Sequence, residues 1–218
     1  HFKQLFDSIK FFELNDLYHE HIAYGTLNDS KGNPFKTREG GTKPLGELFD
    51  ETFKYIKNIN NSLSDSIITC LTNSVLTFSD LITNRKTDYK FNLEKFTNVN
   101  GKTGIYVQYS QVRAKKLINT IGNQSKEIKA LILNKTDKQL LSKLFLFSYY
   151  LEQSALLNEP HHLANYLYEI SNLFNQFYEN EKLTSITDPN QMASKLYIIN
   201  LFLATSHNTM FCLGILPV

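Results

Sequence analysis

Apolar residues recur at the spacing of a helix along most of this chain. The most regular stretch follows Pro160, where large apolar side chains fall within about 140° of arc and asparagine, glutamine and glutamate lie opposite them. The apolar positions are Leu163, Tyr166, Leu167, Ile170, Leu173, Phe174, Phe177 and Tyr178. This pattern predicts an amphipathic helix with one face in a core.

The same spacing predicts helices through most of the remaining sequence. They are expected over residues 1–12, from Pro44 to a polar break at 58–62, from Ser64 to Ile82, from about 105 to 121, from Thr136 through Leu157, and from Asp188 to near Gly214. Ser64 is a favourable N-cap residue, and Thr136 with Gln139 has the spacing of a capping box. A helical bundle is therefore the main architecture that the sequence predicts.

The amino-terminal part has a different pattern. Residues 21–27 alternate loosely and predict a buried strand, and residues 28–43 have the Gly, Asp, Asn and Lys content of a loop. The polar break at 58–62 is the best candidate for a domain boundary. We therefore expect a mainly α fold, with a small α/β part over 1–58 and an all-helical domain over 59–218.

Composition narrows the classes of protein that fit. The 218 residues are 42% apolar and 20% charged, which allows a sizeable core. The formal net charge is only +2, so a nucleic-acid contact would need a local basic patch. Two cysteines form no disulfide framework and fit a reducing cytosol, and no apolar run is long enough to span a membrane. The chain opens on His1, so we expect a fragment of a longer protein.

A loop bounded by glycines, residues 32–41, holds the first candidate chemistry. Lys36 and Arg38 could neutralise charge that develops on a phosphate, and Thr37 could donate a hydrogen bond to it. Glycines would let the backbone approach the ligand closely. Without further context, a basic surface turn is the simpler interpretation.

The helix after Gly104 holds the second candidate site. Tyr106, Tyr109, Arg113 and Lys116 share a face next to the apolar one. Tyrosine rings can stack on unpaired bases while cations hold the nucleic-acid backbone beside them. The alternative is that both tyrosines pack against protein and both cations are solvated.

Three stretches follow one another in the amino-terminal part: His-Ile-Ala-Tyr-Gly at 21–25, Phe-Lys-Thr-Arg-Glu-Gly-Gly at 35–41 and Leu-Gly-Glu-Leu-Phe-Asp-Glu at 45–51. In this order they resemble the end of the catalytic domain of arginyl-tRNA synthetases. In that class I family, whose core is of the Rossmann type, such a loop replaces the Lys-Met-Ser-Lys signature that stabilises the ATP triphosphate. The resemblance implies catalytic roles for Lys36 and Arg38. The ATP-binding residues that it implies are His21, Tyr24, Gly25, Phe35, Lys36 and Thr37.

The stretch after Gly104 resembles the Tyr-Leu-Gln-Tyr-Ala-His-Ala-Arg block of the family's anticodon-binding domain, with departures at Ile105, Ser110 and Gln111. Residues 159–170 resemble the helix that names this domain type. The carboxy-terminal segment resembles the family too, although the chain stops before the customary last residues. The anticodon-binding residues that the resemblance implies are Tyr106, Gln108, Tyr109, Arg113 and Lys116.

Taken together, the resemblance implies a cytoplasmic enzyme that forms arginyl-adenylate from arginine and ATP with Mg²⁺ and transfers arginine to tRNA-Arg. The chain would supply the phosphate loop and the anticodon reader and would not catalyse alone. We expect no membrane or DNA partner. We also expect no resident metal site, because His161 and His162 are adjacent rather than at the usual i, i+4 spacing of two ligands on a helix. Two alternatives stay open: a stand-alone RNA-binding module or inactive paralogue, and a helical scaffold whose tyrosines contact protein.

Overall fold

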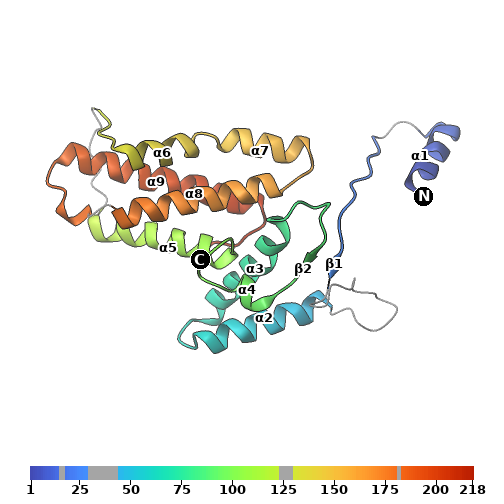
Figure 1. Cartoon of the computed structure of the whole chain (residues 1–218), viewed down its shortest axis with the longest axis horizontal. Helices are drawn as coiled ribbons and strands as arrows, with labels where there is room; N and C mark the ends of the chain where they lie inside the picture. The colour runs from blue at the N-terminus through green and yellow to red at the C-terminus, as the bar shows by residue number, and fades with distance from the viewer. Residues whose placement is uncertain (15–17, 29–43, 123–129, 181–182) are drawn as a thin grey trace.

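The computed structural model describes residues 1–14, 18–28, 44–122, 130–180 and 183–218, which form mainly helices (Figure 1). In chain order they are α1 (Phe2–Phe11), β1 (Leu27–Asn28), α2 (Leu45–Ile59), α3 (Asp65–Leu81), β2 (Tyr89–Lys90), α4 (Leu93–Phe96), α5 (Gly104–Ile121), α6 (Lys135–Leu144), α7 (Phe147–Leu156), α8 (His161–Asn180), the short 3-10 helix Leu183–Ser185 and α9 (Pro189–Cys212). The predicted mainly α fold is confirmed. So is the predicted Ser64 cap, whose side chain accepts a hydrogen bond from the Ile67 amide.

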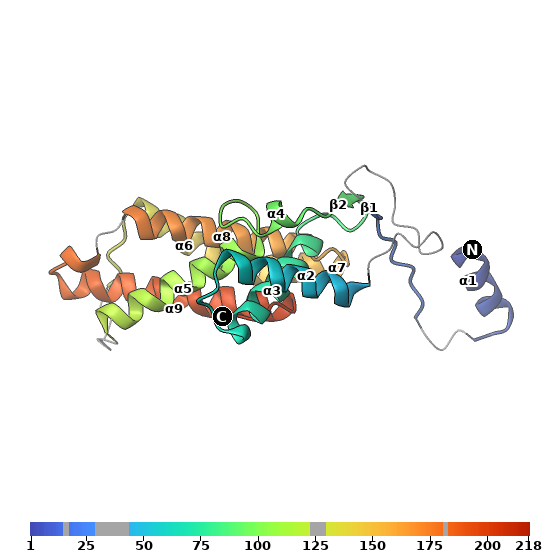
Figure 2. The same cartoon turned by 90° about the horizontal axis from the view of Figure 1, so that it is seen from below.

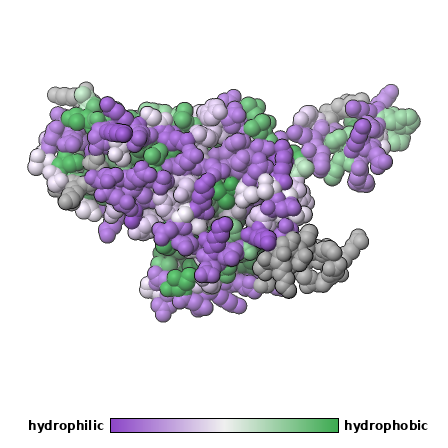
Figure 3. Space-filling view, in the orientation of Figure 1, coloured by the Kyte–Doolittle hydropathy of each residue, from purple (hydrophilic) through white to green (hydrophobic). Residues whose placement is uncertain are grey.

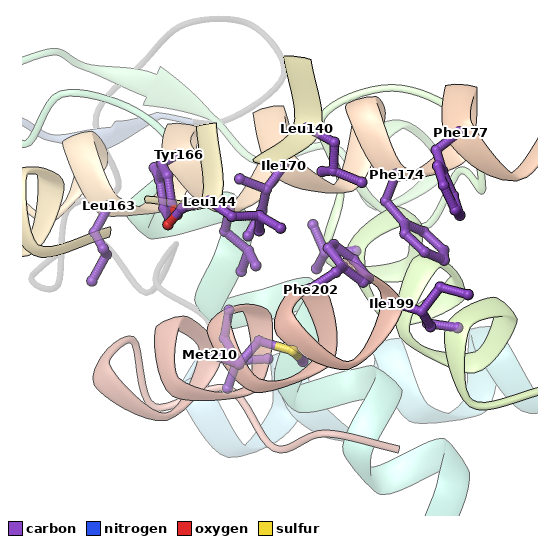
Figure 4. Close-up of a cluster of buried hydrophobic side chains, with 14 of the residues drawn as sticks. Leu140, Leu144, Leu163, Tyr166, Ile170, Phe174, Phe177, Ile199, Phe202 and Met210 are labelled. Atoms are coloured by element: carbon purple, nitrogen blue, oxygen red, sulfur yellow. The ribbon is translucent and has the colours of Figure 1, made fainter. Parts of the chain in front are cut away.

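The core lies between α5, α6, α8 and α9, with α7 covering one end of α8. The apolar face predicted after Pro160 points into it, and Figure 4 shows its side chains meeting those of α6 and α9. Phe174 and Phe202 stack with ring centroids 4.1 Å apart and planes 6° from parallel, and both are fully buried. Burial of this continuous face is the main force that holds the bundle together.

A second layer, α2 and α3, packs against the bundle through α5 (Figure 2). Its own small core contains Ile56, Ile68, Val75 and Phe96. The helices α3 and α5 approach closely at Gly104, where a Cβ atom would lie 2.1 Å from the Ser74 carbonyl oxygen. Only glycine fits there, so the start of α5 has a fixed position on α3.

The helix α1 lies apart from the bundle in both views (Figures 1 and 2). None of the described residues of α1 is buried. The predicted strand at 21–27 is wrong in length, because only Leu27–Asn28 is a strand, paired in parallel with Tyr89–Lys90. Residues 21–24 are exposed rather than buried. A strand requires a hydrogen-bonding neighbour, and among the described residues only β2 supplies one.

The predicted helix from Thr136 through Leu157 is two helices, α6 and α7. Its capping box is also placed two residues earlier than predicted. The Asn134 side chain accepts a hydrogen bond from the Asp137 amide, and the Asp137 carboxylate accepts one from the Asn134 amide. Asp137 is fully buried and pairs with the equally buried Lys195, with Nζ–Oδ2 2.7 Å. The ion pair of Asp137 with Lys195 is a tertiary contact that the local sequence does not show. It favours Asn134 over Thr136 as the N-cap of α6.

Figure 3 shows a face that is mostly hydrophilic, with hydrophobic residues in small separate groups. Among the described helices, none combines the length and the apolar character needed to span a bilayer.

Candidate functional site

The candidate face of α5 begins at a well-anchored helix terminus. The Thr103 hydroxyl accepts a hydrogen bond from the Tyr106 amide at 3.1 Å and donates one to the Asn98 carbonyl at 2.6 Å. With the close approach of Gly104 to α3, these bonds fix the first turn. The side chains of Tyr106 and Tyr109 therefore leave α5 from a rigid platform.

Tyr106 lies against α8 and is half-buried. Its hydroxyl donates a hydrogen bond to Asn172 Oδ1 at 3.2 Å, and its ring lies 5.5 Å from that of Tyr168. The Lys102 ammonium is 5.4 Å from the Tyr168 ring centroid and donates a hydrogen bond to Asn165 Oδ1 at 3.0 Å. Burial raises the pKa of Tyr106, so its phenol is neutral at physiological pH.

Two helical turns further on, Arg113 lies between two tyrosine rings. Its guanidinium carbon is 4.3 Å from the Tyr109 ring centroid and 4.7 Å from that of Tyr178. A guanidinium nitrogen donates a hydrogen bond to Asn175 Oδ1 at 2.9 Å and lies 3.5 Å from the Glu179 carboxylate. Tyr109 stays 45% exposed. Because a guanidinium stacks favourably on aromatic faces, Arg113 holds both rings in place.

Lys116 is exposed one turn beyond Arg113. It completes a strip of cations and aromatic rings that runs along α5 and α8. We call this strip the α5–α8 surface; its members are Lys102, Tyr106, Tyr109, Arg113, Lys116, Tyr168 and Tyr178. Aromatic rings next to cations are the side chains that bind unpaired bases and the phosphates beside them.

Gln108 does not belong to this surface, contrary to the expectation from the sequence. It is 1% exposed. Its amide nitrogen donates hydrogen bonds to Ser74 Oγ at 2.7 Å and to the Leu216 carbonyl at 2.5 Å, while its oxygen accepts one from the Val218 amide at 3.0 Å. On α5 it points away from the tyrosine face, so it holds the carboxy-terminal segment in place.

Three members of the α5–α8 surface were not predicted: Lys102, Tyr168 and Tyr178. Tyr178 was assigned to the core face of its helix. The positions 168, 172, 175 and 179 do recur every three or four residues on α8, which could have indicated a polar stripe. That this stripe faces α5 could not be read from spacing, because it depends on how the helices pack.

The structure describes only part of the predicted ATP site. Phe35, Lys36, Thr37 and Arg38 lie outside the described residues. Of the others, Tyr24 is 84% exposed and His21 stacks on Phe2, with ring centroids 4.0 Å apart. Gly25 passes so close to the loop before β2 that a Cβ atom would lie 2.6 Å from the Thr87 carbonyl.

Glu159, His161 and His162 form the one cluster of potential metal ligands in the described part of the chain, with donor atoms within 4.8 Å of one another. Glu159 is already paired, 3.1 Å from the Lys86 ammonium and 3.3 Å from His162 Nε2. The hydrogen bond from Lys86 is the main cause that lowers the pKa of Glu159. The cluster also lies at the positive end of α8, which disfavours a bound cation.

Comparison with known proteins identifies the family. Residues 107–218, just over half of the chain, match the DALR anticodon binding domain, and residues 1–93 match the catalytic domain of class I tRNA synthetases (R). The chain belongs to the arginyl-tRNA synthetase family. Five members of the α5–α8 surface, Tyr109, Arg113, Lys116, Tyr168 and Tyr178, lie within the matched anticodon binding domain.

Relatives of this chain are curated as arginine–tRNA ligases. It is 37% identical to that of Francisella tularensis subsp. novicida over 178 residues, which are 78% of this chain and 31% of the relative. It is 31% identical to that of Pseudomonas fluorescens over 208 residues, which are 90% of this chain and 36% of the relative. The chain spans about a third of the length of the curated relatives that it matches.

Solved structures support the fold. The arginyl-tRNA synthetase of Thermus thermophilus superposes with a TM-score of 0.78 at 21% identity, covering 90% of this chain and 34% of that one. The Plasmodium falciparum arginyl-tRNA synthetase gives a TM-score of 0.69, also at 21% identity, and covers all of this chain and 38% of that one.

Proposed function

We propose that this chain works as part of an arginine–tRNA ligase and that its α5–α8 surface binds the anticodon loop of tRNA-Arg. Arginine, ATP with Mg²⁺ and tRNA-Arg would be the substrates of the whole enzyme, which we place in the cytoplasm. The domain boundary would fall near residue 59, where α2 ends. Formation of the adenylate would also need residues beyond this chain.

The observation that carries the proposal is the position of Arg113 between Tyr109 and Tyr178. The Tyr109 ring is exposed, yet the guanidinium beneath it limits its motion. A ring that is already ordered loses less conformational entropy when a base stacks on it. The cations at Lys102 and Lys116 flank the ring and could contact phosphates on either side of the stacked base.

Binding of tRNA-Arg by the chain and its variants tests the proposal. Loss of the Tyr109 ring should cost about 1–3 kcal/mol of binding, the range for one base stacked on an aromatic side chain. Lys116→Ala should also flatten the dependence of log K on log salt by about 0.7–0.9 for each lost phosphate contact, because Lys116 is an exposed cation of this surface. Binding is measured by fluorescence anisotropy at several salt concentrations.

The matched control is Tyr149→Ala, which removes an exposed tyrosine on α7, outside the α5–α8 surface. Thermal melts of each variant separate binding from folding. Unchanged affinity in a folded Tyr109→Ala protein would contradict the proposal. Affinity that falls only in step with stability would favour the scaffold alternative.

For the loop at 35–38, we propose that Lys36 and Arg38 stabilise the ATP phosphates during activation of arginine. Lys36→Ala in the full-length enzyme should slow adenylate formation about a hundredfold and leave tRNA affinity nearly unchanged, because the charge is needed only where negative charge develops. Arginine-dependent ATP–pyrophosphate exchange measures this rate. An unchanged rate would indicate that Lys36 is an ordinary cation in a basic surface turn.

A further inference from the structure

Arg85, in the loop between α3 and β2, contacts two parts of the molecule, the extended amino-terminal segment and the turn before α8. Its Nε donates a hydrogen bond to the Asn158 carbonyl at 2.7 Å, in the turn between α7 and α8. A second guanidinium nitrogen donates to the Ala23 carbonyl, in the extended amino-terminal segment. Its own carbonyl accepts a hydrogen bond from the Gly25 amide at 2.5 Å. The side chain is half-buried between the two parts.

Neighbouring contacts hold the same segment in the same place. The Thr26 amide donates to Asp88 Oδ1 at 2.7 Å, which lowers the pKa of that carboxylate. The Tyr89 amide donates to the Thr26 carbonyl at 3.1 Å. Asn158, whose backbone has φ of +52°, also donates from its side chain to the Glu20 carboxylate at 3.3 Å.

The Arg85 side chain contacts both the segment and the bundle turn through one rigid group. A guanidinium is planar and donates hydrogen bonds in two directions at once, which a lysine ammonium on a flexible stem does less well. Bonds from a charged donor to carbonyls in a partly buried place are also stronger than neutral ones. The guanidinium therefore fixes where Ala23 lies relative to the turn before α8, and the Arg85 carbonyl holds Gly25 beside it.

We propose that Arg85 is a positioning residue for ATP: it holds the segment 21–25 against the helical bundle, so that adenosine meets a preformed backbone. This inference rests on the proposed function, and on the ATP-binding role that the family resemblance implies for His21, Tyr24 and Gly25. In this proposal Arg85 itself does not contact ATP. Loss of the Arg85 side chain should therefore displace the segment and weaken ATP binding. Displacement can also slow the reaction, because a shift of about 1 Å near a reacting group can cost roughly a hundredfold in rate.

The test uses Arg85→Gln and Arg85→Lys, with Lys86→Met as matched control. Lys86 is the adjacent cation on the same loop, and its ammonium pairs with Glu159 rather than with the segment 20–26. In the 218-residue chain, hydrogen exchange is measured at the Gly25 and Thr26 amides. In the full-length enzyme, ATP–pyrophosphate exchange gives the KM for ATP and kcat, and anisotropy gives tRNA affinity.

Arg85→Gln should speed exchange of both amides at least about tenfold, a change of about 1.4 kcal/mol in opening free energy. It should raise the KM for ATP about tenfold or more, with tRNA affinity unchanged, and Arg85→Lys should restore part of both. Lys86→Met should change neither. Faster amide exchange with an unchanged KM for ATP, or equal effects from Lys86→Met, would overturn the positioning role. A full-length enzyme with native residues that shows no ATP–pyrophosphate exchange would instead contradict the proposed function itself.

Discussion

The helix α8 and the helix α1 show two ways in which a segment of this chain is held. α8 has 20 residues and buries nine of them, including Phe174 and Tyr166, between α5, α6, α7 and α9. α1 has 10 residues with a regular apolar face, and none of its described residues is buried. A helix of this length without tertiary packing is marginal in water.

The difference shows that an apolar face predicts a helix but not what covers it. In α8 the face meets the four helices around it and becomes part of the core. The segment after α1 contacts the rest of the described chain mainly through hydrogen bonds with Arg85, Asp88 and Asn158: Arg85 and Asn158 donate to the segment, and Asp88 accepts from it. Stability should therefore reside in the bundle, whereas the position of the amino-terminal segment should depend on a few polar groups.

The largest effect should follow from a change in the bundle core. Phe174→Ala removes a fully buried ring that stacks on Phe202 and should lower the free energy of unfolding by about 3–5 kcal/mol. Phe2→Ala, on the exposed face of α1, should cost less than about 0.5 kcal/mol. Urea unfolding followed by circular dichroism measures both. Equal losses of unfolding free energy in the two variants would contradict the distinction between α8 and α1.

A smaller effect should follow from a change where α3 meets α5. Gly104→Ala forces a Cβ atom into the Ser74 backbone and should cost about 1–3 kcal/mol through overpacking. Gly46→Ala in α2 is the matched control, since a Cβ atom there would meet nothing within 4 Å. It should be neutral or stabilising by up to about 1 kcal/mol. Comparable thermal melts for the two variants would show that the close approach is not required.

The start of α6 offers a direct choice between the predicted and the observed cap. Asn134→Ala removes the side chain that accepts the Asp137 amide and should cost about 1 kcal/mol. Thr136→Ala should cost clearly less, because its hydroxyl is not the cap. Chemical denaturation of both variants decides between them, and a greater loss for Thr136→Ala would restore the cap expected from the sequence.

The smallest effect concerns pH. Burial, with a contribution from His162, holds the pKa of His161 below its ordinary value of 6.5. The unfolded chain therefore binds more protons than the folded chain as the pH falls through 6.5, and stability should decrease there. His161→Gln should reduce the loss of melting temperature between about pH 7.5 and about pH 5.5. An identical pH dependence in the variant would exclude His161 as a source.

The sequence was sufficient for the helices whose apolar faces are regular, and for the caps at Ser64 and Asp188. It was insufficient where a contact between distant parts of the chain determines the local structure. The cap of α6 depends on the buried pair of Asp137 with Lys195, which are 58 residues apart. The family resemblance predicts Gln108 as an anticodon-binding residue. A matching position in the sequence does not show that the carboxy-terminal segment encloses this side chain. Spacing placed Tyr109 and Arg113 on one face, yet Tyr178, the second ring on Arg113, required the packing of α8.

The most direct test of the central claim compares two pieces of tRNA-Arg as competitors for the chain. One is a hairpin with only the anticodon stem and loop, and the other is a minihelix with only the acceptor end. Binding at the α5–α8 surface predicts that the hairpin displaces labelled tRNA-Arg and the minihelix does not, and that Tyr109→Ala weakens the hairpin by about 1–3 kcal/mol. Displacement by the minihelix alone, or a hairpin affinity that Tyr109→Ala leaves unchanged in a folded protein, would contradict it.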